Sequence, residues 1–188
     1  NMITAIIQAR LGSTRLPNKI FYNLCGKPII WHVYSRLLSS KLIDQIVIAT
    51  TKKQTDKKLY DWSIKNKIKV YRGSQNNVLN RYFKAASKFK ASIIVRITAD
   101  DPFKDSGLID SVIKLLIDNN MDFTFNNNPP TFPEGLDVEV FNFESLKIAN
   151  ELCDNSNDRE HVTQYFFKNS DKFKMLNYKS KINYSHLR

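Results

Sequence analysis

The sequence predicts a three-layer α/β/α sandwich, in which a mostly parallel sheet lies between helices. Short apolar runs recur along the first two thirds of the chain, and segments with apolar residues at spacings of three and four separate them. Strands that alternate with helices of ten or more residues are typical of βαβ units. The composition agrees, since 188 residues with 42% hydrophobic and 25% charged side chains suit one globular domain.

Residues 3–9 are predicted as the first strand, because an almost continuous apolar run ends there before turn residues at Gly12 and Pro17. Four later runs have the same character: residues 45–51, 69–71, 92–98 and 122–126. The segments between them are predicted as helices from their apolar spacing: residues 28–40, 55–66, 77–89 and 106–119.

The pattern changes after the fifth predicted strand. The turn-rich segment NNNPPTFPEG precedes residues 136–141, in which apolar and polar residues alternate strictly. A helix from about Phe143, another from about Asp158 and a strand near Phe173 follow. This order predicts an antiparallel addition to the parallel core. Neither an internal repeat nor a linker interrupts the chain, so we predict one domain over residues 2–188.

The composition argues against several classes of protein. No apolar stretch approaches the roughly 18 residues that a membrane-spanning helix needs, so we expect no membrane partner. Cys25 and Cys153 form no C-x-x-C pair, and the N-terminus shows no signal-peptide pattern. We therefore expect a protein of the reducing cytoplasm. Asn1 precedes the apparent initiator Met2 and is left out of the fold prediction.

The formal net charge of +11 is typical of proteins that bind a polyanion. The basic residues are nevertheless spread along the chain, and one tight cluster stands out: Lys52, Lys53, Lys57 and Lys58. Because no basic arm is present, we do not expect a nucleic-acid partner. A non-catalytic polyanion-binding module remains an alternative hypothesis.

The segment R-L-G-S-T-R-L-P-N-K directly follows the first predicted strand. Ligands of open α/β sheets bind beyond the carboxyl ends of the strands. Arg10 and Arg15 can fork onto phosphate oxygens, and Lys19 supplies a point charge. Gly12 lets backbone N–H groups approach a ligand closely, and Ser13 adds a hydroxyl. These features predict polyphosphate binding, although a solvated basic turn would have the same composition. One glycine is too few for a P-loop or a Rossmann fingerprint.

Asp100 follows the strand predicted at residues 92–98 and therefore lies at the same edge of the sheet. Magnesium takes one or two carboxylates and completes its shell with phosphates and water, so Asp100 is the candidate metal ligand. The alternative is that Asp100, Asp101 and Asp105 are turn and capping residues ahead of the next helix. That alternative suits Asp105 best.

Residues 136–141 place Asp137 and Glu139 on one face of a predicted strand, roughly 6–7 Å apart. Two acids on one face could grip sugar hydroxyls or an amino group, but a solvated strand face would look the same. Glu134, Arg159 and His161 are weaker candidates for the same role. The segment around Arg159 and His161 reads equally as a charged first helical turn.

The basic loop closely resembles the signature R-x-G-S-x-R-x-x-x-K of the CTP-dependent sugar cytidylyltransferases, which activate acylneuraminate, Kdo and related acidic sugars. Further blocks resemble the spore-coat polysaccharide biosynthesis protein F group in the same order: RGS with VLNRY, VRITADDP, PPTFPEGLDVEVF and REHVT. The resemblance covers nearly the whole chain. It implies a nucleotide-diphospho-sugar transferase fold of the glycosyltransferase A type, transfer of CMP from CTP to a sugar, Mg²⁺ dependence and a homodimer.

The resemblance also implies roles for single residues. The triphosphate would be held by Arg10, Ser13, Arg15 and Lys19, with Gly12 in the same loop. Asp100 matches a metal-binding aspartate of the family, whereas Asp101 lies where the family varies. Family members normally continue into an acidic segment with a second metal-binding aspartate, so we expect that a C-terminal segment is lacking, and that these 188 residues bind CTP but turn it over poorly.

Arg72 and Arg81 match blocks close to where the nucleotide would lie, although Arg81 reads equally as the exposed face of an amphipathic helix. The match of GLDVEV strengthens the assignment of Asp137 and Glu139 to the sugar side. Asn76, Asn77 and Asn80 depart from the family, which often has acidic residues there, and this leaves the substrate preference open. Trp31, Trp62 and His32 are expected to pack the first helices rather than to bind a ligand.

The loop reads phosphates and not the base. Another nucleotidyltransferase or a glycosyltransferase of the same fold is therefore the second enzymatic hypothesis.

Overall fold

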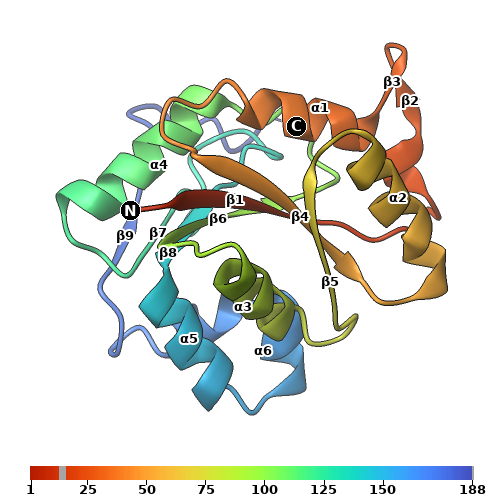
Figure 1. The fold of residues 1–188 in the computed structure, drawn as a ribbon. Helices are drawn as coiled ribbons and strands as arrows, with labels where there is room; N and C mark the ends of the chain where they lie inside the picture. The colour runs from red at the N-terminus through yellow and green to blue at the C-terminus, as the bar shows by residue number, and fades with distance from the viewer. Residues whose placement is uncertain (13–15, 188) are drawn as a thin grey trace.

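The computed structural model describes residues 1–12 and 16–187 (Figure 1). Its main sheet has seven strands in the order β5-β4-β1-β6-β8-β7-β9. Their bounds are β1 Ile3–Gln8, β4 Gln45–Thr51, β5 Lys69–Gly73, β6 Ile93–Thr98, β7 Phe123–Phe125, β8 Glu139–Asn142 and β9 Met175–Asn177. Only β8 runs against its neighbours β6 and β7, whereas the other pairings are parallel. The predicted mostly parallel sheet with an antiparallel addition is confirmed.

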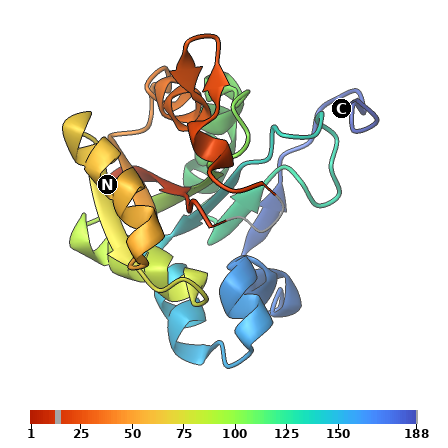
Figure 2. The same cartoon turned by 90° about the vertical axis from the view of Figure 1, so that its right-hand side faces the viewer.

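Helices cover both faces of this sheet, which confirms the three layers (Figures 1 and 2). One face is packed by α1 (Ile29–Leu37), α2 (Lys57–Lys65) and α4 (Ser106–Asp118). The other is packed by α3 (Val78–Lys88), α5 (Phe143–Leu152) and the short α7 (Gln164–Lys168), and the short α6 (Ser156–His161) lies against α3. Successive side chains of β1 point to opposite faces of the sheet, as in any strand. Ala5 and Ile7 pack against the layer of α1, α2 and α4, and Ile6 packs against the opposite layer.

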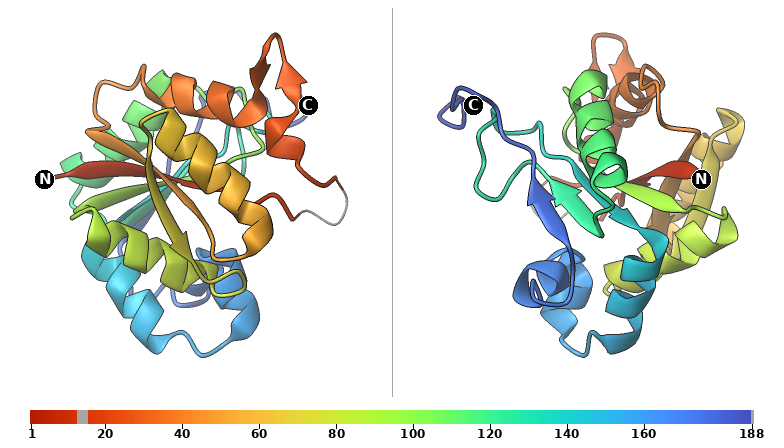
Figure 3. Two further views of the ribbon diagram at one scale, coloured as in Figure 1. Left: turned by 45° about the vertical axis from the view of Figure 1, so that its right-hand side comes forward. Right: turned by 90° about the vertical axis from the view of Figure 1, so that its left-hand side faces the viewer.

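Three short elements lie around the first βα connection. The 3₁₀ helix η1 (Lys19–Phe21) leads into a small hairpin of β2 (Asn23–Leu24) and β3 (Lys27–Pro28), which stands beside α2 (Figure 3). A second 3₁₀ helix, η2 (Gln54–Asp56), precedes α2. Within the described ranges no helix is long and apolar enough to cross a membrane.

Two predicted boundaries are shifted in the structure for identifiable reasons. The strand predicted at residues 136–141 begins only at Glu139, because the Asn126 side chain takes the hydrogen bonds of the preceding residues: its Oδ1 accepts from the Val138 N–H at 2.8 Å, and its Nδ2 donates to the Leu136 carbonyl at 3.0 Å. The helix predicted from about Asp158 begins at Ser156, because the Asn155 side chain caps it.

Candidate active site

A pocket of about 250 Å³ opens at the carboxyl ends of β1 and β6. It is lined by Gln8, Ala9, Arg10, Lys19, Ile20, Thr98, Ala99 and Asp100. After β1 the chain goes to β4 on one side and later to β6 on the other, so the pocket lies at the switch point of the strand order. Ligands of open α/β sheets bind at this place, which makes the pocket the candidate active site.

Lys19 and Asp100 meet across this pocket from segments 81 residues apart. Lys19 Nζ donates to Asp100 Oδ2 at 2.8 Å, and both side chains are partly exposed. Asn18 adopts a left-handed backbone with φ of 58° immediately before η1, a conformation that Asn tolerates better than most residues, and η1 begins with Lys19. The structure thus brings together the cation and the carboxylate that the sequence singled out.

Burial raises the pKa of Asp100, but the hydrogen bond and the charge of Lys19, together with a backbone hydrogen bond and one from Thr98, outweigh that effect and leave the pKa below its usual value. In Lys19→Met the effect of burial is no longer opposed by this cation, so we expect the pKa of Asp100 to rise. The chemical shift of the Asp100 carboxyl carbon, followed by NMR as the pH is lowered, measures the change. An unchanged titration would show that Lys19 does not set the charge of Asp100 in solution.

A buried carboxylate, that of Asp56, holds the start of the basic loop. Asp56 is 2% exposed, and its Oδ1 accepts from the Leu11 N–H at 2.7 Å, while its Oδ2 accepts from the Thr51 hydroxyl. The sequence analysis missed Asp56, because an acid at the start of a predicted helix reads as a helix cap. In the structure its side chain makes no capping bond to α2. It links the loop after β1 to the end of β4 instead.

Arg72 supports the same region from β5. Its Nε donates to the Thr51 carbonyl at 3.0 Å and its Nη2 to the Lys53 carbonyl at 2.8 Å, while the guanidinium lies 5.7 Å from the centre of the Tyr60 ring. Arg72 does not line the candidate pocket. Its assignment to the nucleotide stays a prediction, and its observed contacts order the segment that leads to Asp56.

Arg81 is 1% exposed, so the alternative that it lies on an exposed helix face is wrong. Its Nη1 donates to the Ser74 carbonyl at 3.0 Å, and burial lowers its pKa. Gly73 makes room for it, since a Cβ atom at residue 73 would lie 2.9 Å from Arg81 Cγ and 2.9 Å from a Tyr71 ring carbon. A glycine before the loop into α3 therefore allows a buried arginine at that helix.

A small polar cavity of about 70 Å³ adjoins the candidate pocket, and Thr98 lines both. Glu139 lies at this cavity, only 6% exposed, where its Oε2 accepts from Arg96 Nη1 at 2.5 Å and its Oε1 from the Thr163 hydroxyl at 3.0 Å. The solvated strand face is therefore the wrong interpretation for Glu139. Asp137 lines the same cavity and is more exposed, and partial burial raises its pKa although Lys104 acts in the opposite direction.

Lys104 holds the walls of this cavity together. It is 1% exposed, and its Nζ donates to Asp101 Oδ2 at 3.1 Å and to the carbonyls of Gly135 and Asp137 at 3.1 and 2.8 Å. Asp101 is thus bound to Lys104 rather than free in a turn. Asp105 does cap α4, because its Oδ1 accepts from the Leu108 N–H at 2.7 Å, as the sequence suggested.

The remaining sequence candidates are less close to this site. Arg159 donates to Asn77 Oδ1 at 3.4 Å and to the Asn150 carbonyl at 3.0 Å, and it shares no pocket with Asp100. His161 is exposed at the end of α6, and Glu134 is exposed with its backbone N–H on the Leu187 carbonyl.

In the loop itself, Arg10 is exposed at the pocket, whereas Ser13 and Arg15 lie outside the described residues. Among residues 1–12 and 16–187, no atom other than those of adjacent residues would lie within 4 Å of a Cβ atom at Gly12. The role of Gly12 in bringing backbone N–H groups close to a ligand stays a prediction.

Comparison with known proteins agrees with this geometry. A family model described as cytidylyltransferase matches residues 4–188. The spore coat polysaccharide biosynthesis protein SpsF of Bacillus subtilis is 38% identical over 170 residues, which are 88% of this chain and 70% of that protein. The solved structure of a cytidylyltransferase from Leptospira borgpetersenii superposes with a TM-score of 0.94 at 35% identity and covers 100% of this chain and 80% of its own.

A more distant structure supports the fold alone. It is a CMP:2-keto-3-deoxy-manno-octonic acid synthetase complexed with CTP, with a TM-score of 0.72, 16% identity and coverage of 96% of this chain and 91% of that one. The switch-point pocket and the cations beside it suit a phosphate ligand, and the family model over residues 4–188 shows that this chain belongs to the cytidylyltransferase family.

Proposed function

We propose that this protein transfers CMP from CTP to a sugar hydroxyl and releases pyrophosphate, in the synthesis of a surface or spore-coat polysaccharide. The observation that carries the proposal is the pairing of Lys19 with Asp100 at the switch-point pocket, with Arg10 on the same rim. The polysaccharide role is supported by the name of the Bacillus subtilis relative. We further propose a homodimer, which the resemblance implies, and a location in the cytoplasm, which the cysteine usage and the N-terminal sequence favour.

In this reaction the sugar oxygen attacks the α-phosphate in line with the leaving pyrophosphate. The protein contributes position and charge, which are the main needs of phosphoryl-type transfer. Lys19 and Arg10 lie where they can hold phosphate oxygens, and Ser13 and Arg15 of the same loop would complete that shell. The Asp56 hydrogen bond fixes the backbone from which these side chains leave.

The side chains present fit a magnesium ion only in part. Within residues 1–12 and 16–187 no three His, Cys, Asp or Glu side chains gather to hold a metal. Asp100 is a single carboxylate that is partly exposed at the pocket, and Mg²⁺ can be bound by one carboxylate together with substrate phosphates and water. Asp100 would therefore hold the ion. When bound, Mg²⁺ neutralises the charge that builds on the leaving phosphates.

For the sugar we propose the side of the candidate pocket that faces the small cavity lined by Asp137. Of the two acids predicted there, Glu139 is occupied by Arg96 and Thr163, whereas the Asp137 carboxylate is nearer to solvent. Glu134, Arg159 and His161 remain weaker proposals, because neither the candidate pocket nor the cavity beside it includes them.

A thermal-shift series with CTP, UTP, GTP, ATP and sugar nucleotides, each with Mg²⁺, tests the proposal. A ligand at 100 times its Kd stabilises a protein by about 2.7 kcal/mol, so CTP should raise Tm more than any other nucleotide. A larger shift with UTP or GTP would favour another nucleotidyltransferase. No shift with any nucleotide, together with salt-sensitive binding of unrelated oligonucleotides, would favour the polyanion-binding module.

A further inference from the structure

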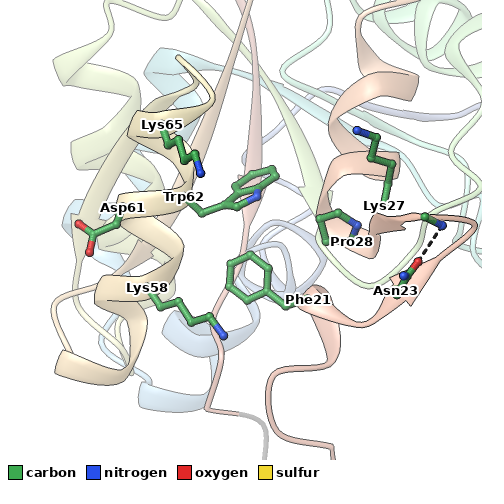
Figure 4. Close-up of a pocket in the computed structure, with 9 residues that line it drawn as sticks. Phe21, Asn23, Lys27, Pro28, Lys58, Asp61, Trp62 and Lys65 are labelled. Carbon is green, nitrogen blue, oxygen red and sulfur yellow. Dashed lines mark hydrogen bonds between the residues drawn. The ribbon is translucent and has the colours of Figure 1, made fainter.

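A second and larger pocket lies outside the candidate active site. It has a volume of about 540 Å³ and opens between η1, the β2–β3 hairpin and α2 (Figure 4). Its lining residues are Phe21, Asn23, Gly26, Lys27, Pro28, Lys58, Asp61, Trp62 and Lys65. None of these lines the pocket of Lys19 and Asp100. Its size lies in the range of small-molecule sites.

The floor of this pocket is aromatic. The rings of Phe21 and Trp62 lie 5.9 Å apart at 71°, edge to face, and Figure 4 shows them facing the space between α2 and the hairpin. Both are only partly buried, so each leaves ring surface open. Trp62 packs against the core, as the sequence predicted, and it also lines this pocket. A planar apolar group would bury ring surface here and gain edge or stacking contacts.

The rim of the pocket carries uncompensated positive charge. Lys27, Lys58 and Lys65 are exposed, and none of them belongs to an ion pair in the described part of the chain. The one acid on the rim, Asp61, binds Lys57 at 2.6 Å and points away from Phe21 and Trp62 (Figure 4). Lys58 Nζ lies over the Phe21 ring, 5.2 Å from its centre, so this ammonium group is next to the aromatic floor of the pocket.

We propose that this pocket binds a small anion that carries an aromatic ring, such as an aryl phosphate. The ring would lie against Phe21 and Trp62, and the anionic group would reach the ammonium groups of Lys58 and Lys65 on α2. This site accounts for Lys58, one residue of the basic cluster noted in the sequence, whereas its neighbour Lys57 pairs with Asp61. The ammonium groups alone would attract any anion. The aromatic floor selects among them.

The two chain tryptophans allow a direct test. Trp31→Phe leaves Trp62 as the only tryptophan, and its fluorescence is followed during titration with phenyl phosphate, benzyl alcohol and inorganic phosphate at low salt. We expect a saturable change with phenyl phosphate and at least a tenfold weaker response to the neutral alcohol and to the ion without a ring. Equal binding of phenyl phosphate and benzyl alcohol, or no saturable change, would overturn the proposal.

Variants separate this pocket from the candidate active site. In the Trp31→Phe background, Lys58→Gln with Lys65→Gln should raise the Kd for phenyl phosphate at least tenfold. The control pair Lys114→Gln with Lys147→Gln removes the same charge from exposed positions on α4 and α5 and should leave the Kd within twofold. Binding that Lys19→Gln abolishes, and that the Lys58 and Lys65 changes leave intact, would place the ligand on the nucleotide loop and refute the second site. Because CTP takes no part in these titrations, their failure does not depend on the proposed function.

Discussion

Lys19→Ala is expected to lower kcat/KM for pyrophosphate release from CTP by about 10²-fold or more, in the presence of an acceptor sugar. A decrease of this size is typical when an enzyme loses one preorganised hydrogen-bond donor, which here would contact the phosphates during transfer. It should appear in kcat as well as in KM, because charge on the leaving group is greatest in the transition state. Steady-state assays of pyrophosphate release measure both constants.

Lys57→Ala is the matched control for this prediction. Lys57 is also an exposed lysine in an ion pair with an aspartate, at 2.6 Å, but its partner is Asp61 on the surface of α2. Its removal should leave both constants within about twofold. If Lys19→Ala turned over CTP as fast as the wild type, the assignment of this loop to the triphosphate would fail.

Asp56→Ala is expected to raise KM for CTP about tenfold or more and to lower the free energy of unfolding by about 1–3 kcal/mol. The change leaves the Leu11 N–H and the Thr51 hydroxyl buried without their acceptor. It also frees the backbone of the loop from its fixed position, and small displacements of a binding group are costly. Kinetics and urea denaturation of the same protein separate the two effects.

Two variants distinguish positioning from stability. Asp44 makes an equivalent bond at the opposite end of β1, where its Oδ2 accepts from the Ile3 N–H at 2.7 Å, so Asp44→Ala should destabilise the fold and leave KM unchanged. Asp56→Asn keeps an oxygen for the Leu11 N–H and should restore most of the binding. An equal rise of KM in Asp44→Ala and Asp56→Ala would mean that general loosening, and not the anchored loop, accounts for the effect.

The sequence was sufficient to predict the sheet and one half of the site. Periodicity locates strands, and parallel strands end at a common edge, so residues that follow β1 and β6 had to meet there. This is how the loop that contains Lys19 and the residue Asp100 could be assigned to the same edge of the sheet before any coordinates. Glycine and proline turns after β1 gave the loop its place.

The remaining half depends on partners that no local pattern reveals. Asp56 acts on a backbone N–H 45 residues away, and any residue other than proline offers such a group. Glu139 occupies a polar position in the alternating segment 136–141, which is typical of a solvated residue. In the structure it is buried and pairs with Arg96 on the adjacent strand β6. Arg81 has the helical spacing of an exposed side chain and becomes buried because residue 73 lacks a side chain. Each case is a tertiary contact that overrides a local rule.

The contact between Gly73 and Arg81 constrains how this protein can evolve. Any side chain at residue 73 would meet the buried stem of Arg81 and the Tyr71 ring at 2.9 Å, and neither the stem nor the ring can withdraw cheaply from a packed layer. A lineage that loses the glycine must therefore first shorten the residue at 81, and one that keeps the arginine keeps the glycine. The two positions are expected to covary, even though seven residues of sequence and the start of α3 lie between them.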